Sequence, residues 1–421
     1  MAVHQEARLE PSNGNPPDRN APERRPASGS SRGVDARLPV ALLGAGGIGR
    51  MHAQRLRVHP DVCLAGVADP NPAARAWAEG LGVPWCAEPA ELLDRVRPGA
   101  AIVATPNSLH TAVGLACIER RIPLLVEKPI ADTVAEARRL ADAARAANVP
   151  VLVGHQRRHG VAVQRARRLI AEGAVGRVVA VTMLAAWLKP ARYFTEGPWR
   201  RQKGGGPVLI NAIHDIDLLR HLVGEVAAVH AMASSAQRGF EVEDTAAAVL
   251  RLASGALATL VVTDSAVSPW NYDIVSGESE LYPPQVADAL YIAGTEGALT
   301  VPQLLHWRYR GASPEQRHWH AELTREQTTL HRRDPFAEQL RHLRAVAEGR
   351  EVPLCSAEDG IATLRATQAV LESAATGATV EIDPEQGHVG GGEGKGTGGN
   401  AGRLAGEAVE TNSGGSQGGG R

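Results

Sequence analysis

The chain has 421 residues, a formal net charge of −1 at pH 7 and 43% hydrophobic residues. This length permits two or three domains, and the near-neutral charge excludes a general attraction to nucleic acid or to an anionic membrane surface. The four cysteines include no C-x-x-C pair, so we expect neither a disulfide framework nor a metal site. No apolar run reaches the roughly 20 residues that span a bilayer and no apolar leader begins the chain, so a cytoplasmic protein without a membrane partner is expected.

The two ends of the chain differ in composition from its middle. Residues 1–36 are rich in Pro, Asn, Arg and Ser, and residues 385–421 are dominated by glycine. Neither segment can bury enough apolar surface to offset the entropy of ordering, so we predict a disordered N-terminal segment and a flexible C-terminal tail. Between them we predict two domains, residues 37–154 and residues 155–384.

The first predicted domain alternates short apolar runs with helical stretches. The clearest helix covers residues 133–148, where Thr133 and Glu136 form a capping box and Asn148 provides a stop. Strands that alternate with helices predict an α/β Rossmann domain with a doubly wound parallel sheet. The predicted strands cover residues 39–43, 62–68, 100–104, 124–126 and 151–153.

The pattern changes after residue 154. Strands now follow one another through short turns, such as the one at Gly255, which predicts an α+β domain with a large, open, mainly antiparallel sheet. The predicted strands cover residues 178–187, 226–232, 245–252, 256–262, 272–277 and 298–307, and the predicted helices cover residues 162–172, 209–222, 335–348 and 357–376.

A glycine-rich turn follows the first predicted strand. Gly44 permits a tight passage from strand to helix, Gly46 allows the backbone to approach a phosphate, and Gly49 allows the helix to pack on the strand. The first-turn amides, including those of Gly47 and Ile48, then face the phosphates together with the positive end of the helix dipole. This spacing is typical of a dinucleotide-binding turn.

Asp69 ends the second predicted strand, 20 positions after Gly49. A carboxylate there can accept hydrogen bonds from both hydroxyls of a ribose, and it would repel the 2′-phosphate of NADP. Because no arginine directly follows Asp69, we expect NAD rather than NADP as the cofactor. The alternative is that Asp69 caps the helix that begins near residues 71–72.

The next crossing from strand to helix is the run from Thr105 to His110. The carboxyl ends of parallel strands line the ligand crevice, so Thr105, Asn107 and His110 are counted among the cofactor-facing residues. Asn107 or Ser108 also suits the cap of the following helix. Within that helix, His110 is better suited to packing than to catalysis.

Glu127, Lys128 and Pro129 follow the predicted strand at residues 124–126, so they face the same crevice. A lysine there can hydrogen-bond a substrate hydroxyl and take up its proton as a hydride leaves, and burial lowers its pKa toward a useful range. Glu127 can hold the lysine or a ribose. The alternative is a surface ion pair beside a loop proline.

The predicted helix at residues 209–222 carries Asn211, His214, Asp215 and Asp217 in an otherwise apolar segment. The helical repeat places the first three of these side by side. His214 can exchange protons near neutral pH, and Asp215 or Asp217 can orient its ring. The alternative is the solvated face of a packed helix.

Other polar and aromatic residues are candidates for contact with a substrate. His155 and Arg157 follow the last strand of the first predicted sheet, and Trp187 and Arg200 precede a run of three glycines. Aromatic rings stack on sugar rings, and arginine binds carboxylates. Loop packing or subunit contacts are the alternative. The same two segments contain Gln156, Arg158, Lys189, Tyr193, Trp199 and Arg201.

Taken in chain order, these motifs resemble the Gfo/Idh/MocA family of oxidoreductases over most of residues 38–383. The resemblance implies a Rossmann domain followed by a domain whose open sheet forms a homo-oligomer, a dimer or a tetramer. It implies that Lys128 and His214 are the catalytic pair and that Glu127 and Asn107 contact the cofactor. It rests on residues 44–49, 105–110, 127–129, 204–206, 214–217 and 294–297.

The chain departs from the family at one position. Many relatives carry an aspartate four residues before the histidine, where this chain has Ile210, and Asn211 follows it. Asparagine can orient a hydroxyl but cannot accept its proton. The proton relay would then depend on Lys128 and His214.

These observations predict an NAD-dependent dehydrogenase that acts on a secondary alcohol of a cyclic polyol or sugar. One alternative is the same chemistry on a carboxylated cyclic diol or a sugar acid, which the arginine-rich segments motivate. Another is a sensor that binds NAD and a sugar without chemistry. The presence of both Lys128 and His214 argues against the sensor.

Overall fold

The computed structural model describes residues 36–279 and 281–383. The predicted disordered segment, apart from Ala36, and the predicted glycine-rich tail therefore lie outside the described residues. From Leu38 onward the chain builds two sheets, which are taken here in turn. No helix in the described ranges has the length and apolar character that crossing a membrane requires.

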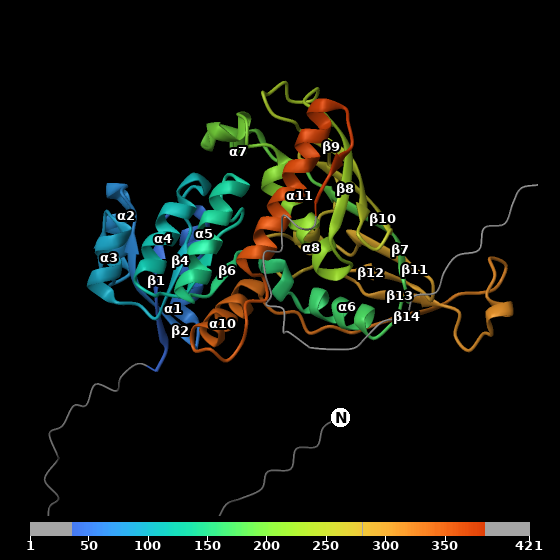
Figure 1. The fold of residues 1–421 in the computed structure, drawn as a ribbon, viewed down its shortest axis with the longest axis horizontal. Coiled ribbons are helices and arrows are strands. Elements are labelled where there is room, and N and C mark those ends of the chain that lie inside the picture. The colour runs from blue at the N-terminus through green and yellow to red at the C-terminus, as the bar shows by residue number, and fades with distance from the viewer. Residues whose placement is uncertain (1–35, 280, 384–421) are drawn as a thin grey trace, which may run out of the picture. The chain divides into compact units, whose positions relative to one another are not determined.

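The first sheet has six parallel strands in the order β3-β2-β1-β4-β5-β6, so the predicted doubly wound Rossmann sheet is confirmed (Figure 1). Its strands are β1 (Leu38–Leu43), β2 (Val62–Ala68), β3 (Trp85–Cys86), β4 (Ala100–Val103), β5 (Leu124–Val126) and β6 (Val151–Val153). The connecting helices are α1 (Gly47–Val58), α2 (Pro72–Gly80), α3 (Pro89–Val96), the 3₁₀ turn η1 (Asn107–Leu109), α4 (His110–Glu119) and α5 (Val134–Ala147).

Helices cover both faces of this sheet because parallel strands bury both of their sides. On one face pack α3, α4, α5 and the start of α11 (Ala357–Thr376), and on the other pack α1, α2 and α10 (Pro335–Ala347). Leu340 and Leu343 of α10 are fully buried in this second layer. Two helices from the C-terminal part of the chain therefore complete the core of the first sheet.

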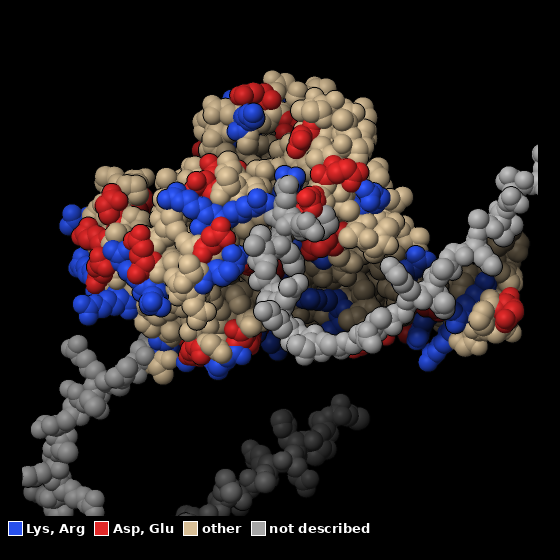
Figure 2. Space-filling model, in the orientation of Figure 1, with Lys and Arg blue, Asp and Glu red and all other residues tan. Residues whose placement is uncertain are grey.

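On the face shown in Figure 2, acidic and basic side chains are interspersed.

The second sheet has nine strands in the order β14-β13-β12-β11-β7-β10-β9-β8-β15. All neighbours run antiparallel except β7 and β10, which run parallel, so the predicted mainly antiparallel sheet is confirmed. Its strands are β7 (Val178–Ala186), β8 (Val226–Ser234), β9 (Thr245–Leu252), β10 (Leu257–Thr263), β11 (Leu290–Gly294), β12 (Ala298–Val301), β13 (Leu305–Arg308), β14 (Thr324–Gln327) and β15 (Val380–Glu381).

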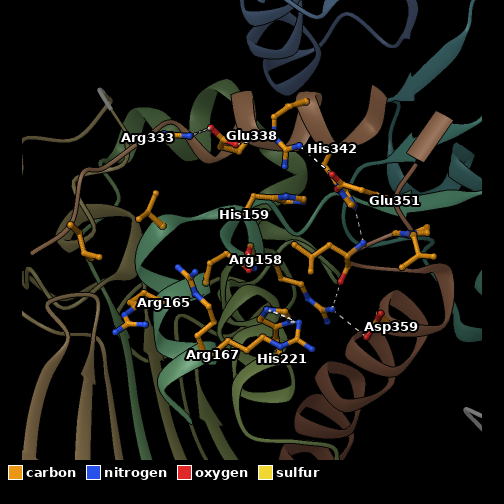
Figure 3. A pocket seen from close by; sticks show the side chains of 18 of the residues that line it. Arg158, His159, Arg165, Arg167, His221, Arg333, Glu338, His342, Glu351 and Asp359 are labelled. Atoms are coloured by element: carbon orange, nitrogen blue, oxygen red, sulfur yellow. Dashed lines mark hydrogen bonds and ion pairs between the residues drawn. The ribbon is translucent and has the colours of Figure 1, made fainter. Parts of the chain in front are cut away.

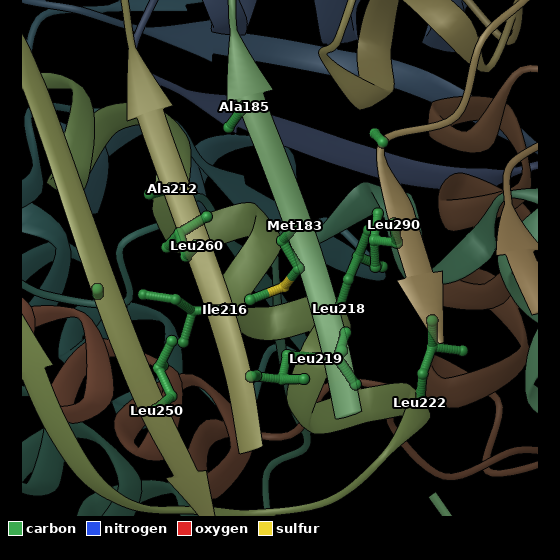
Figure 4. Packing of buried hydrophobic residues seen from close by; sticks show 14 of the residues in the cluster. Met183, Ala185, Ala212, Ile216, Leu218, Leu219, Leu222, Leu250, Leu260 and Leu290 are labelled. Carbon is green, nitrogen blue, oxygen red and sulfur yellow. The ribbon is translucent and has the colours of Figure 1, made fainter. Parts of the chain in front are cut away.

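One face of the second sheet is covered by α6 (Val161–Ala171), α8 (Ile213–Leu222) and the second half of α11. Figure 4 shows Ile216 and Leu219 of α8 packed against Met183, Leu250 and Leu260 of the strands. The short elements around this sheet are η2 (Gln156–His159), α7 (Ala191–Glu196), η3 (Pro198–Arg201), the π-helical turn η4 (Val208–Ala212), α9 (Tyr272–Val275) and η5 (Pro314–Gln316).

Two predicted strands are wrong. Residues 272–277 were predicted as a strand, but residues 272–275 form the helix α9. The Asn271 side chain caps this helix by accepting a hydrogen bond from the Asp273 amide. Residues 298–307 form two strands, β12 and β13, because the chain turns at Leu304, whose φ is +54°. The strands β3, β11, β14 and β15 were missed.

Candidate active site

The glycine-rich turn joins β1 to α1 as its spacing predicts. Gly44 has φ of +104°, and a Cβ there would lie 2.4 Å from Ala104 O, so only glycine fits. A Cβ at Gly49 would collide with the backbone oxygen of Gly44. A Cβ at Gly46 or Gly47, in contrast, would enter open space, and no side chain caps the amides at the start of α1. This arrangement fits the pyrophosphate of a dinucleotide.

Asp69 is held against this turn. Its Oδ2 accepts a hydrogen bond from the Ala45 amide at 2.7 Å, and its Oδ1 accepts one from the Asn71 amide at 2.8 Å. The cap of α2 is the Asn71 side chain, which accepts a hydrogen bond from the Ala73 amide, so the alternative role of Asp69 as a helix cap is wrong. The carboxylate remains at the carboxyl end of β2, where a ribose would lie.

The residues after β4 have three different environments. Thr105 Oγ1 is buried and has no hydrogen-bond partner among the described residues, which leaves a hydroxyl ready for a ligand. Asn107 Oδ1 accepts a hydrogen bond from the Ser108 amide within η1, and neither residue caps α4, contrary to the prediction. Both ring nitrogens of the buried His110 lie 2.9 Å from the backbone oxygens of Pro129 and Thr105.

The environment of His110 corrects one assignment. With both ring nitrogens occupied by the backbone, its side chain is not available to a cofactor, and it instead ties the β4 loop to the segment after β5. Burial lowers the pKa of His110. Its role is therefore to pack and position these two loops.

Glu127 is buried at the end of β5 and binds a residue that the sequence reasoning missed. Its Oε1 lies 2.7 Å from Nε2 of His52, and its Oε2 accepts a hydrogen bond from the Lys128 amide at 3.2 Å. Burial opposes ionisation, but His52 and the charge of Lys128 outweigh it and hold the pKa of Glu127 below its usual range. His52 follows Gly49 by three residues on the sheet-facing side of α1, and this spacing was its only signal.

Lys128 crosses from the first sheet to the segment before α8. Its Nζ donates a hydrogen bond to the backbone oxygen of Ile210 at 3.0 Å, one turn before His214. Burial lowers the pKa of Lys128, and the nearby charge of Arg157 acts in the same direction. The alternative of a surface ion pair is therefore wrong.

Whereas Lys128 is half-buried, His214 is buried, with 7% of its surface exposed. Burial and the charge of Lys128 hold its pKa well below the usual value, so the ring is neutral. Its Nδ1 is buried without a hydrogen-bond partner in the described structure, and its ring meets that of His155 edge-on, with the centroids 5.7 Å apart. The structure therefore brings Lys128 and His214 together from β5 and α8.

The two aspartates of α8 do not orient His214, contrary to the prediction. Asp215 accepts a hydrogen bond from Arg157 at 3.0 Å, and Asp217 binds Arg158 through both carboxylate oxygens, at 2.7 and 2.9 Å. Arg157 also binds both oxygens of Asp273, at 2.9 and 3.1 Å. Its guanidinium is thus fully engaged and does not suit the predicted contact with substrate.

His155 lies beneath the site rather than at its surface. It is 1% exposed, neither ring nitrogen has a hydrogen-bond partner among the described residues, and Asp217 Oδ2 lies 3.7 Å from Nδ1. Burial lowers the pKa of His155 to about 4. Its contact with His214 makes it a support for that ring.

Lys189 is a second lysine at the site, and it is buried. Its Nζ donates a hydrogen bond to Asn211 Oδ1 at 2.6 Å and lies 4.6 Å from the centre of the Tyr193 ring. Burial lowers the pKa of Lys189 to about 8, and the charge of Lys128 contributes to this. Asn211 is therefore oriented by a lysine, and the Nε1 of the adjacent Trp187 is buried without a partner among the described residues.

Arg200 is engaged by its own segment. Its guanidinium lies 3.8 Å from the centre of the Tyr193 ring and donates a hydrogen bond to the Tyr193 backbone oxygen at 2.6 Å. These contacts hold η3 against α7. Within the described ranges, no group of three His, Cys, Asp or Glu side chains is placed to hold a metal ion.

Comparison with known proteins places this site in a family. The oxidoreductase family with an NAD-binding Rossmann fold, GFO/IDH/MocA, matches residues 38–155, and the GFO/IDH/MocA C-terminal domain matches residues 163–300. The chain is 29% identical to 1,5-anhydro-D-fructose reductase of Ensifer adhaerens, over 68% of this chain and 80% of the relative. It is 27% identical to inositol 2-dehydrogenase 2 of Saccharopolyspora erythraea, over 83% and 97%.

A solved structure shares the fold. The WlbA dehydrogenase of Bordetella pertussis, in complex with NADH and UDP-GlcNAcA, superposes with a TM-score of 0.68. The match covers 82% of this chain and 99% of that chain, at 24% sequence identity.

Proposed function

Because this chain belongs to the GFO/IDH/MocA family of NAD-binding oxidoreductases, we propose that it transfers a hydride between a secondary alcohol of a cyclic polyol or sugar and NAD. The observation that carries the proposal is the convergence of the half-buried Lys128 and the buried His214, each shifted toward its neutral form. The substrate class is supported by relatives that are named as an inositol dehydrogenase and an anhydrofructose reductase.

The residues present fit NAD, which supplies the hydride acceptor when it is bound. The uncapped amides of the turn at residues 44–49 would hold the pyrophosphate. Asp69 would accept hydrogen bonds from the ribose hydroxyls, and the unpartnered Thr105 Oγ1 offers a further contact. Asn107 and Glu127 would complete the cofactor side of the site.

Lys128 acts as the base in the proposed reaction. An uncharged Nζ accepts the proton of the substrate hydroxyl while the C–H hydride leaves, and the alcohol becomes a ketone. Burial favours the uncharged amine, and the hydrogen bond to Ile210 O fixes the position of Nζ. Neutral His214 would bind the same hydroxyl and share its proton.

A panel of substrates tests this proposal. Purified full-length protein with NAD is assayed for NADH formation against inositols, neutral cyclic sugars and sugar acids. Oxidation of at least one neutral ring alcohol is the expected result. The absence of hydride transfer across the whole panel, together with tight NAD binding, would favour a sensor that does no chemistry.

A carboxylated ring is a second candidate substrate, and one observation favours it. Lys189 is 8% exposed, and its nearest carboxylate oxygen, Asp264 Oδ2, is 3.9 Å away, while Asp264 already binds Arg238. A substrate carboxylate would compensate this buried charge. Lys189→Met should then lower kcat/KM for the sugar acid selectively. Turnover of neutral polyols but not of sugar acids would exclude this candidate.

We also propose that the protein is a homo-oligomer, a dimer or a tetramer, that associates through its second sheet. The face of the sheet that lies opposite α6, α8 and α11 presents large apolar side chains to solvent, which is typical of an interaction surface. These exposed residues are Val179, Met232, Val249, Leu257, Val261 and Tyr291. None of the four cysteines forms a disulfide, which supports a proposed cytoplasmic location.

A further inference from the structure

A large open cavity lies apart from the proposed active site. It has a volume of about 1370 Å³, and its walls come from η2, α6, α8, α10 and the segments at residues 328–333 and 350–354 (Figure 3). Neither Lys128 nor His214 lines it, and nor does any residue of the glycine-rich turn. The cavity is therefore a separate feature of the fold.

The lining of this cavity is strongly basic. It contains eight arginines and four histidines but only four carboxylates, although the chain as a whole is almost neutral. Glu338 of α10 and Glu351, which follows that helix, are paired with Arg341, and Glu351 is also bound to His342. On α6, Arg168 has no ion pair among the described residues, and Arg167 contacts only a histidine ring. The other six arginines are ion-paired with Asp217, Asp359, Glu172, Glu225, Glu338, Glu351 and Glu348. The positive charge of this cavity that no described carboxylate compensates therefore lies on Arg167 and Arg168.

The floor of the cavity holds two histidines without acidic partners. His159 is about nine-tenths buried, makes no hydrogen bond within the described structure, and stacks at 5.2 Å on the ring of His342. His221 has both ring nitrogens 3.3 Å from the Arg167 guanidinium. Figure 3 shows His159 and His221 directed into the same space. His159 is therefore a hydrogen-bonding group that a ligand would satisfy, whereas His221 already has Arg167 as its partner.

The charges around the floor of the cavity indicate the sign of the charge that a ligand would carry. Burial lowers the pKa of His159 to about 3, and His342, Arg341 and Arg158 act in the same direction. Burial also lowers the pKa of His221 to about 3, and the charge of Arg158 adds to this. The charges of Arg167 and Arg168, which no carboxylate among the described residues compensates, together with these neutral imidazoles form an environment that an anion would stabilise.

We propose that this cavity binds a small polyanion that carries at least two phosphate or carboxylate groups. Arg167 and Arg168 of α6 are exposed and have no carboxylate partner among the described residues, and the largely buried His159 lines the same cavity. Arg158 and Arg220 are held by Asp217 and Glu225, so they shape the floor rather than bind the ligand. Two neighbouring arginines and an imidazole in one cavity suit a compact molecule with separated anionic groups.

The position of η2 connects this cavity to the proposed active site. Arg157 of this turn binds Asp215 beside His214, and His159 of the same turn faces the cavity. An anion bound at the floor would therefore contact a turn whose other side supports the catalytic histidine. The binding proposal itself does not depend on the proposed dehydrogenase activity.

Calorimetry on the full-length protein, saturated with NAD, tests the proposal. Saturation prevents the probes, inorganic pyrophosphate and citrate, from binding at the glycine-rich turn. We expect saturable binding of at least one probe, and the preferred probe distinguishes phosphate from carboxylate recognition. The double variant Arg167→Gln/Arg168→Gln should weaken it about tenfold or more, because charge-assisted hydrogen bonds are lost. Both side chains are exposed on α6, so folding should be unaffected.

A matched control removes one cation elsewhere. Arg251→Gln lies on the exposed face of β9, outside the cavity, and should leave the affinity for the probe unchanged. The proposal is overturned if neither probe binds saturably to the wild type, or if the α6 double variant binds as tightly as the control. Oxidation of ring alcohols should persist in the α6 double variant, so failure here is distinguishable from failure of the proposed dehydrogenase.

Discussion

Lys128 combines three properties that a proton acceptor needs. It is half-buried, its Nζ is fixed by one hydrogen bond to Ile210 O, and its pKa is lowered from that of a free lysine. Glu127, directly before it, is bound to His52 and so does not form a tight ion pair with the Nζ. The lysine is thereby positioned without a tight ion pair that would stabilise its charged form.

Replacing Lys128 tests its role as the base. Lys128→Met keeps the length of the side chain but removes the amine, so kcat should fall by roughly 10²–10⁴-fold. NAD affinity, measured by fluorescence titration, should change little because the glycine-rich turn is intact. Lys203→Met, at an exposed lysine before η4, is the matched control and should retain kcat. Full activity in Lys128→Met would contradict the assignment.

The pH dependence of the rate follows from the same residue. A base must be unprotonated, so kcat should rise with pH up to the pKa of Lys128, which burial places below 10.5. A pH–rate profile of the alcohol oxidation measures this limb. Burial also lowers the pKa of Lys189, to about 8, so the variant Lys189→Met distinguishes the two lysines. If Lys128 is the base, the rise of kcat with pH should remain in this variant. A rate that falls as pH rises would be inconsistent with a lysine base.

Asp69 should determine the choice between NAD and NADP. Its carboxylate is fixed by the Ala45 and Asn71 amides, and it would repel a 2′-phosphate. Asp69→Ser should raise KM for NAD about tenfold and reduce the preference for NAD over NADP. Steady-state kinetics with both cofactors measure the ratio. An unchanged ratio would show that the carboxylate plays no part in the discrimination.

At the scale of elements, η2 holds the floor of the site through buried ion pairs. Arg157→Met would leave Asp215 and Asp273 without their cation, and Asp215 is fully buried. We expect a loss of about 3–5 kcal/mol in unfolding free energy, measured by urea denaturation. Arg75→Met removes an exposed ion pair on α2 and should cost under about 1 kcal/mol. Equal stability of the two variants would argue against the structural role of Arg157.

Local signals made part of this site predictable. Gly44, Gly49 and Lys128 each follow a short apolar strand, and the order of strand, turn and helix is encoded within a few neighbouring residues. The π-helical start of α8 and the short helix α9 were not predicted, because one side-chain cap or one extra residue in a turn decides such elements.

Long-range pairs could not be predicted at all. Arg157 and Asp273 are 116 residues apart, and His52 and Glu127 are 75 residues apart. No short pattern links such residues, because only the packed chain determines which carboxylate meets which cation. For this reason the predicted contact of Arg157 with substrate and the predicted contact of Asp215 with His214 were both wrong. The two residues bind each other instead.

At the scale of the whole chain, the two sheets share helices that come late in the sequence. Leu340 and Leu343 of α10 pack on the first sheet, and α11 contributes Ile361 to that core and Val370 to the core of the second. A division of the chain at residue 154 therefore separates the sheets but not their cores. The predicted boundary divides the strands of the two sheets along the sequence, but α10 and α11, which follow it, also pack on the first sheet.

The exposed face of the second sheet gives the last test, because apolar side chains there should be buried between copies of the chain. Val249→Glu combined with Val261→Glu would place two charges per copy on β9 and β10. Analytical ultracentrifugation should show a homo-oligomer for the wild type and a 44.4 kDa monomer for this variant. Val58 lies on α1, which packs on the first sheet, so Val58→Glu should leave the mass of the oligomer unchanged. A monomeric wild type would leave this apolar face without its proposed partner, because a surface between copies must associate at assay concentrations.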